Sequence, residues 1–383
     1  MKFLRQKTEG KIILAVSDLH LGAGPFIGER DNPLEEFHRD YEFSLLLEHF
    51  STGPYFSQRV ELVINGDFLD FLAVPYIEVF EDQYWGQSAS LKRLAMIYNG
   101  HKTVFDALIN FLKQPDKTLI YILGNHDGEL ILPSVSEAFY NFFPQDLRAK
   151  ICILSHSNAE YRPLPEIVFK HGHEYEMANY RNSDEAILQG VDGELHYNPP
   201  WGSYYVVRVI NKFKAFSPHI QSVRPIKKFI IHGLIYDTLN TMRFILANVA
   251  YFFMVRFIYL FKSRRKFKEM MRYLREELVM FRNDNQIIED YFENNEEVKA
   301  LVVGHSHGPL YKQFWSGPLF INTGTWMQMH NLDFDRPVSS QSMPFALIVV
   351  GDHSSNQSIV ELGLYHWHGR ASNAPYISYA TLA

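Results

Sequence analysis

Cysteine is almost absent from this sequence, with only Cys152 among 383 residues, so a disulfide framework is excluded. Cys152 lies in an apolar run, and we expect it to be buried as a small hydrophobic side chain. Internal repeats and low-complexity tracts are also lacking. The apolar part of the N-terminal segment is too short for a secretory signal and is typical of a strand, so we expect a cytoplasmic protein.

Acidic side chains are scarce in one part of the chain. Residues 201–275 contain fifteen Lys and Arg but only Asp237 and Glu269, a net charge of +13 that leaves −19 for the remainder. The whole chain carries −6 and is 46% hydrophobic, which is an ordinary globular composition. A charge difference of this size between two parts of one chain indicates an anionic partner surface.

Short apolar runs rich in β-forming residues recur along the chain, and helical patterns fill several of the gaps between them. Strands that alternate with helices predict an α/β fold (α+β by some schemes), with its chemistry in loops at the strand ends. We expect strands at residues 11–17, 60–65, 118–123, 151–154, 167–170, 298–303, 319–322, 345–350 and 358–364, and helices at residues 35–50, 90–112 and 134–143.

Residues of metal-ligand type follow five of these strands, in the motifs D-x-H, G-D, G-N-H-D, H-G-H and G-H-S-H. D-x-H and G-D are weak evidence when taken alone, because a single Asp or His serves in many turns. G-N-H-D is more specific, and G-H-S-H is stronger still, because two histidines two residues apart can bind a metal together. Five strand ends that all carry such residues, in this order, are specific. The candidate metal ligands are Asp18, His20, Asp67, Asn125, His171, His305 and His307.

This set supplies two carboxylates, one amide oxygen and four imidazoles, which suit divalent ions such as Mn²⁺ first, with Fe or Zn as alternatives. One ion cannot use all seven groups, whereas two ions can if Asp67 bridges them. Two ions about 3.5–4 Å apart can hold a bridging hydroxide and stabilise an in-line phosphoryl displacement. His126, supported by Asp127, is the candidate general acid for the leaving group.

The ordered motifs D-L-H-L, G-D-F-L-D, G-N-H-D, H-G-H and G-H-S-H resemble those of the calcineurin-like metallophosphoesterase superfamily over residues 12–326. The resemblance implies a four-layer αββα sandwich that holds two cations. The first cation is expected at Asp18, His20, Asp67 and His307, and the second at Asp67, Asn125, His171 and His305. Further candidates for contacting these ligands or the substrate are Asp70, His173 and Asn179.

Within that superfamily, the chain is most similar to the UDP-2,3-diacylglucosamine pyrophosphatases. The similarity lies in D-L-H-L-G, in G-H-S-H followed by a strand, and in a helical cap between the last histidine motifs. His126 and His173 stand where that branch carries Arg and Asp, so a different phosphate ester is the alternative substrate.

The cap is predicted as an insertion of residues 175–295 into a catalytic domain of residues 1–174 and 296–383, with helices at residues 205–216, 231–261 and 267–281. Residues 244–261 are apolar apart from Asn248 and Arg256, and three interpretations stay open. They form a core helix, a membrane span at a cost of about 2.5–3.5 kcal/mol for the Arg, or a surface for acyl chains or the membrane interface. The basic cluster at residues 262–268 could hold anionic headgroups at about 1 kcal/mol per basic residue.

The sequence therefore predicts a dinuclear-metal phosphoesterase that hydrolyses a phosphate ester or pyrophosphate bond in a lipid-linked substrate. We expect it at the inner face of an anionic membrane, as a peripheral protein without an obligate protein partner. A nuclease or nucleotide phosphodiesterase of the same superfamily is the alternative enzyme. A membrane-associated binding scaffold is the non-enzymatic alternative, and it would be expected to have lost some of the seven ligands.

Overall fold

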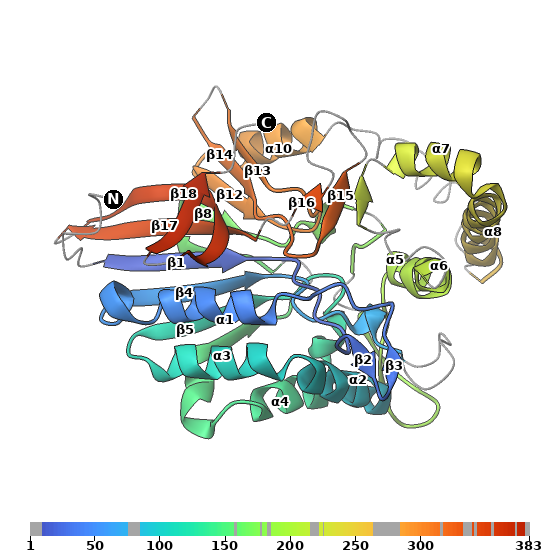
Figure 1. The fold of residues 1–383 in the computed structure, drawn as a ribbon, viewed down its shortest axis with the longest axis horizontal. Helices are drawn as coiled ribbons and strands as arrows, with labels where there is room; N and C mark the ends of the chain where they lie inside the picture. Colours follow the sequence, from blue (N-terminus) through green and yellow to red (C-terminus); the bar gives the residue numbers. More distant parts are fainter. Residues whose placement is uncertain are drawn as a thin grey trace.

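Two β-sheets stack face to face and are covered by helices on their outer sides in the computed structural model of the chain (Figure 1). The fold is therefore the predicted αββα sandwich. The structure describes residues 10–75, 85–156, 159–176, 178–181, 185–214, 222–224, 226–262, 284–314, 317–331, 339–340, 343–353, 356–371 and 374–379.

The larger sheet has seven strands, and the four at one side of it are parallel. Its order is β19 (Ala374–Tyr379), β18 (Asn356–Ala371), β17 (Pro344–His353), β1 (Gly10–Val16), β4 (Arg59–Asn65), β5 (Lys117–Ile122) and β6 (Ile151–Leu154). Strands β1, β4, β5 and β6 are parallel, whereas β17, β18 and β19 pair antiparallel. β1 is buried at six of its seven positions, as a strand covered on both faces must be.

Cys152 lies on β6, the strand at one edge of this sheet, and its side chain is exposed. The prediction of a buried thiol is therefore wrong. An apolar run does not reveal that its strand occupies a sheet edge, where one side chain can face solvent.

The smaller sheet has five strands, and its inner face packs on the larger sheet. Its order is β13 (Leu310–Gln313), β14 (Leu319–Asn322), β12 (Ala300–Val303), β8 (Ile167–Phe169) and β7 (Tyr161–Leu164). Ile13 and Val63 of the larger sheet share one apolar cluster with Phe169 and Val302 of the smaller sheet. This cluster is the central layer of the core.

Four helices cover the outer face of the larger sheet: α1 (Asp40–His49), α2 (Gln87–Gly100), α3 (Lys102–Lys113) and α4 (Pro133–Asn141). The helix predicted at residues 90–112 is in fact two helices, α2 and α3, separated at His101. On the smaller sheet, Ile288 and Phe292 of α10 (Asp284–Asn294) pack against Val168 and Leu301. The predicted insertion, residues 175–295, includes α10, yet this helix forms the fourth layer of the sandwich.

The remaining helices of the insertion lie beside the sandwich (Figure 1). They are α5 (Trp201–Tyr205), a π-helical turn (Val206–Ile210), α6 (Asn211–Lys214), α7 (Ile226–Tyr236) and α8 (Thr238–Lys262). Lys214 pairs with Glu36 at 3.3 Å, and Asn211 donates to the carbonyl of Leu72 at 2.7 Å, which ties this helical region to the sandwich. The helix predicted at residues 267–281 lies outside the described residues.

One face of α8 packs inward, since Phe244 and Tyr251 join Val209 and Ile210 in a small apolar cluster. Asn248, which interrupts the apolar run, accepts a hydrogen bond from the Tyr205 hydroxyl at 2.5 Å. Within the described part of the chain, no helix has the length and apolar character that a membrane crossing needs.

Seven further strands among the described residues are short. They are β2 (Phe26–Ile27) and β3 (Arg30–Asp31), which pair with each other, β9 (Ile187–Gln189) and β10 (Leu195–Tyr197), which form a second pair, and β11 (Val223–Arg224), β15 (Met329–Asn331) and β16 (Ser339–Ser340) in a small sheet with β15 at its centre.

Candidate metal centre

The seven candidate ligands follow the carboxyl ends of parallel strands from both sheets. Asp18 and His20 follow β1, Asp67 follows β4, and Asn125 follows β5 in the larger sheet. In the smaller sheet His171 follows β8, while the G-H-S-H motif follows β12. The stacked sheets therefore bring five loops together at one edge, as is usual for sites in such folds.

Five of these ligands have left-handed backbone conformations: Asp18, His20, Asp67, His305 and His307, with φ between 50° and 68°. Asp116 is the other non-glycine residue with positive φ among the described residues. This conformation is costly for residues with a side chain and is concentrated at functional sites in proteins. Its concentration on the predicted ligands supports a functional role for this edge.

The first half of the centre is formed by Asp18, His20 and His307, whose ligand atoms lie within 4.8 Å of one another. Nε2 of His20 lies 3.1 Å from Nε2 of His307 and 3.9 Å from Oδ1 of Asp18. Nδ1 of His20 contacts Oδ2 of Asp70 at 3.1 Å. Because Asp70 holds one ring nitrogen, the other faces the cluster.

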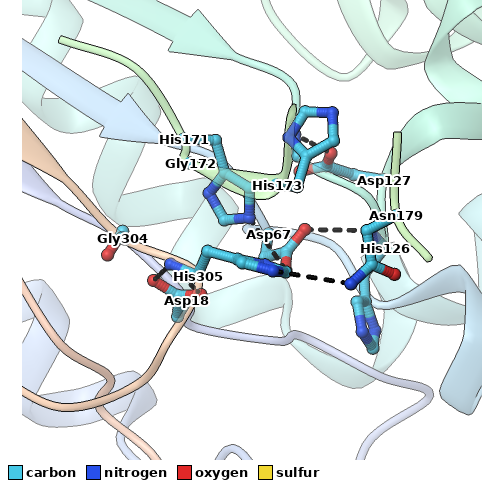
Figure 2. A network of polar contacts seen from close by, with 12 residues as sticks. Asp18, Asp67, His126, Asp127, His171, Gly172, His173, Asn179, Gly304 and His305 are labelled. Atoms are coloured by element: carbon cyan, nitrogen blue, oxygen red, sulfur yellow. Dashed lines mark hydrogen bonds and ion pairs between the residues drawn. The ribbon is translucent and has the colours of Figure 1, made fainter. Parts of the chain in front are cut away.

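The second half is formed by Asp67, His171 and His305, again with ligand atoms within 4.8 Å. Nδ1 of His171 contacts the carbonyl oxygen of Asn65 at 2.8 Å, and its Nε2 lies 3.2 Å from Oδ2 of Asp67. The backbone amide of His305 donates to both carboxylate oxygens of Asp18 at 3.0 Å, which joins the two halves (Figure 2).

Asp67 contacts ligands of both halves, and Figure 2 shows it beside His171 and His305 of the second half. Its Oδ2 is 3.2 Å from Nε2 of His171 in the second half and 3.8 Å from Nε2 of His20 in the first. Its Oδ1 accepts a hydrogen bond from the backbone amide of His126 at 2.8 Å. One carboxylate therefore contacts both halves, as a bridging ligand must.

An unsatisfied polar atom and close backbone approaches indicate that the cluster fits metal ions. Oδ1 of Asn125 is buried without a hydrogen-bond partner among the described residues, a costly state that a cation would relieve. Gly124 permits the packing, because a Cβ there would lie 2.1 Å from Oδ1 of Asp67. At Gly304 a Cβ would lie 2.4 Å from Oδ2 of Asp18.

The charges of the cluster shift its pKa values. Burial alone lowers the pKa of His20, but its hydrogen bond to Asp70 and the neighbouring carboxylates raise it to about 9. Burial opposes the same effect at His171, where Asp67 raises the pKa to about 10. Against the effect of burial, the charges of His171 and His126 hold the pKa of Asp67 well below its usual range. The negative charge that attracts these protons attracts cations equally, so protons and metal ions compete for the ring nitrogens.

A family comparison agrees with this geometry. The model of the calcineurin-like phosphoesterase family matches residues 12–309, which include all seven candidate ligands. This chain belongs to the calcineurin-like phosphoesterase family. A comparison with curated proteins found no match to this phosphoesterase.

Solved structures with similar folds share little sequence with this phosphoesterase. A dimetal phosphatase from Danio rerio has 12% identity and a TM-score of 0.37, over 91% of this chain and 98% of that chain. A calcineurin-like phosphoesterase from Bacillus subtilis has 12% identity and a TM-score of 0.33, over 93% and 89%. Zinc-bound Vps29 from Entamoeba histolytica has 11% identity and a TM-score of 0.27, over 96% and 98%.

The structure corrects one predicted pairing in the phosphoesterase site. Nδ1 of His126 contacts Oδ1 of Asp70 at 2.9 Å, so Asp70 and not Asp127 supports this histidine. Asp127 instead accepts hydrogen bonds from the amides of Phe68 and Gly124 and from the hydroxyl of Tyr121. Its burial, with the charge of Asp67, raises the pKa of Asp127 to about 6. Asp127 therefore fixes the loops, whereas Asp70 links His20 to His126.

His173 and Asn179 lie against the second half, as Figure 2 shows. The ring of His173 is 5.3 Å from that of His171, and its two nitrogens are buried without a hydrogen-bond partner among the described residues. Burial and the nearby histidines keep the pKa of His173 well below its usual value, so the ring is neutral. Asn179 reaches Nε2 of His305 at 3.5 Å, and Glu176 reaches the same atom at 3.0 Å. Sequence reasoning missed Glu176, because a lone carboxylate in a polar loop has no distinctive signal.

The segment after β14 supports the first half from behind. The hydroxyl of Thr323 lies 2.6 Å from that of Ser17, and the hydroxyl of Thr325 donates to the carbonyl of Asp18 at 2.5 Å. Nδ2 of Asn322 donates to the carbonyl of Gly304 at 2.7 Å. These buried contacts hold the loops of Asp18 and Gly304 in register.

Proposed function

We propose that this phosphoesterase hydrolyses a phosphate ester or pyrophosphate bond with two divalent cations, Mn²⁺ first among them. The observation that carries the proposal is the position of Asp67, whose carboxylate contacts both halves of the candidate centre. Asp18, His20, Asp67 and His307 would hold one cation, and Asp67, Asn125, His171 and His305 the other. Such a pair, when bound, makes water a nucleophile near neutral pH and stabilises the charge that develops on the phosphoryl oxygens.

His126 is the group proposed to protonate the leaving oxygen. Its Nδ1 is held by Asp70 at 2.9 Å, which leaves Nε2 as the ring nitrogen for the substrate. The side chain of His126 is 12% exposed, whereas the neighbouring ligand His171 is fully buried. A histidine that is oriented by a carboxylate and still accessible is suited to general acid catalysis.

The proposed substrate is lipid-linked, such as UDP-2,3-diacylglucosamine, and the apolar surface of the helical insertion supports this class. α7 and α8 expose eight large apolar side chains, with Tyr236 86% and Leu239 64% exposed. Patches of this kind on soluble proteins mark interaction surfaces. The exposed residues are Ile231, Leu234, Ile235, Tyr236, Leu239, Met242, Leu246 and Val249.

The proposed occupant of this surface is a bilayer of anionic lipids. Residues 201–275 carry fifteen basic side chains against two acidic ones, so the charge of this region complements anionic headgroups. Apolar side chains beside basic ones are the combination that holds peripheral proteins in the membrane interface. An enzyme docked in this way would meet lipid-linked substrates without extracting them into water.

Hydrolysis of several substrate classes by the purified, Mn²⁺-supplemented protein tests the reaction. We expect turnover of a small chromogenic phosphodiester and faster turnover of a lipid-linked pyrophosphate, both abolished by a chelator. Faster turnover of nucleotides or single-stranded DNA would favour the alternative enzymes. Protein that binds no divalent cation and hydrolyses none of these substrates would be the non-enzymatic scaffold.

Vesicle binding tests the proposed membrane surface separately. Ile235→Ser, Tyr236→Ser and Leu239→Ser together should weaken binding to phosphatidylglycerol vesicles at least about 10-fold, because each buried apolar side chain is worth about 1.5–3 kcal/mol. Hydrolysis of the small phosphodiester should be unchanged. Val191→Ser, on an exposed apolar residue of the β9–β10 loop, is the matched control and should bind vesicles as wild type does. Equal vesicle binding by the triple variant would disprove this surface.

A further inference from the structure

Glu176 lies at the start of the helical insertion, directly after the short 3-10 helix His173–Tyr175, and contacts a candidate ligand. Its Oε2 is 3.0 Å from Nε2 of His305. Nδ2 of Asn179 donates to the same carboxylate at 2.8 Å. It also lies 3.5 Å from the same ring nitrogen of His305 (Figure 2). Two side chains of the insertion therefore meet at one nitrogen of this ring.

The geometry is that of a supporting group rather than a ligand. The ligand atoms of Asp67, His171 and His305 lie within 4.8 Å of one another, and Glu176 belongs to no such group among the described residues. His20 shows the same pattern, because Asp70 holds one ring nitrogen while the other faces the cluster. Histidines that bind metals usually donate their second ring N–H to such an oxygen.

The start of the insertion is itself fixed by its first helix. The amide of Gly202 on α5 donates to the carbonyl of Ala178 at 2.8 Å. A Cβ at Gly202 would lie 2.5 Å from Oδ1 of Asn179, so α5 packs directly on this segment. Contacts therefore run without a break from α5 through Asn179 and Glu176 to His305.

We propose that Glu176 is a positioning residue that holds Nε2 of His305, turns Nδ1 towards the second cation, and so couples the affinity of that cation to the helical insertion. The inference rests on the proposed two-cation function and extends it. It assigns the insertion a part in building the metal centre, besides any part in substrate binding.

Calorimetric titration of the metal-free full-length protein with Mn²⁺ tests the proposal. Wild type should bind two ions, and Glu176→Ala should weaken one of them by about 10–100-fold while the other is unchanged. Glu176→Gln keeps an oxygen that can accept from the ring N–H, so its loss should be smaller. Glu185→Gln, which removes an exposed carboxylate of the same insertion, is the matched control and should bind both ions as wild type does.

The visible absorption of the Co²⁺-loaded protein separates a positioning residue from a ligand. The spectrum of Glu176→Ala at saturating Co²⁺ should match that of wild type, since the number of ligands is the same. A changed coordination number would make Glu176 a ligand and overturn the proposal, as would unchanged affinity for both ions. Wild-type protein that binds no ion would instead refute the two-cation function itself, so the two failures are distinguishable.

Discussion

The two halves of the metal centre differ in what supports them. In the first half, Asp70 holds His20, and the loop that follows His20 is held by Glu35, which accepts from the amide of Gly24 at 2.7 Å. All of these groups belong to the sandwich. In the second half the outermost ligand, His305, meets Glu176 of the insertion. The first half is thus supported within the sandwich, whereas one ligand of the second half contacts a side chain of the insertion.

Asp67→Ala should remove the feature that the two halves share and produce the largest effect. We expect hydrolysis to fall below detection and at most one Mn²⁺ to bind per chain, because the carboxylate that contacts both halves is gone. Activity assays and metal analysis of the dialysed protein measure the two effects. Turnover at a substantial fraction of the wild-type rate would show that the halves do not depend on this carboxylate.

His126→Ala should slow hydrolysis by about 10²–10⁴-fold while both halves keep their cations. The reason is that Oδ1 of Asp67 accepts from the backbone amide of His126, a contact that the alanine variant retains. Metal analysis and single-turnover rates check this pair of outcomes. Loss of a cation would instead make the His126 side chain a ligand.

His101 contacts Glu35, which holds the loop after His20 in the first half. Its contribution to the free energy of unfolding should depend on pH. Burial lowers its pKa, but the hydrogen bonds to Asp40 and Glu35 raise it from 6.5 to about 9. A raised pKa stabilises the folded protein fully below pH 6.5, and this contribution is lost as the pH rises through 9. A shift of this size corresponds to about 3 kcal/mol.

The free energy of unfolding of wild type and of His101→Gln, measured from pH 6 to pH 10, checks this contribution. The difference between the two proteins should shrink by about 3 kcal/mol across that range. A difference that does not change with pH would mean that His101 carries no charge in the folded protein.

Asp127→Asn should leave both halves of the centre functional and give the smallest effect. Asp127 accepts three buried hydrogen bonds but makes none to His126, so we expect a loss of about 1–3 kcal/mol of unfolding free energy. Chemical denaturation measures this loss, and kcat of the folded protein should stay close to wild type. A fall in kcat like that of His126→Ala would restore Asp127 as the partner of the catalytic histidine.

The sequence was sufficient to predict the strand ends that carry the ligands, because a fold alone rarely requires Asp, Asn and His side by side directly after a buried apolar run. It led to Asp127 as the partner of His126, whereas the structure places Asp70 there. Both carboxylates lie in loops, and the sequence pattern does not specify the backbone conformations there, such as the positive φ of Asp67. The role of Glu176 could not be predicted from the sequence either, because it depends on the contact between the insertion and His305.

Domain boundaries were predictable only in part. The helical character of the insertion was clear from its composition, yet its final helix, α10, belongs to the sandwich. Its apolar residues Ile288 and Phe292 suit either environment, and only the packing against Val168 and Leu301 decides between them.

Electron paramagnetic resonance of the Mn²⁺-loaded protein tests the central claim most directly. If Asp67 joins two cations, wild type will bind two Mn²⁺ per chain and give the spectrum of a magnetically coupled pair, and Asp67→Ala will lose that coupling. Saturated wild-type protein that shows a single ion, or two uncoupled ions, would contradict a shared carboxylate at this centre.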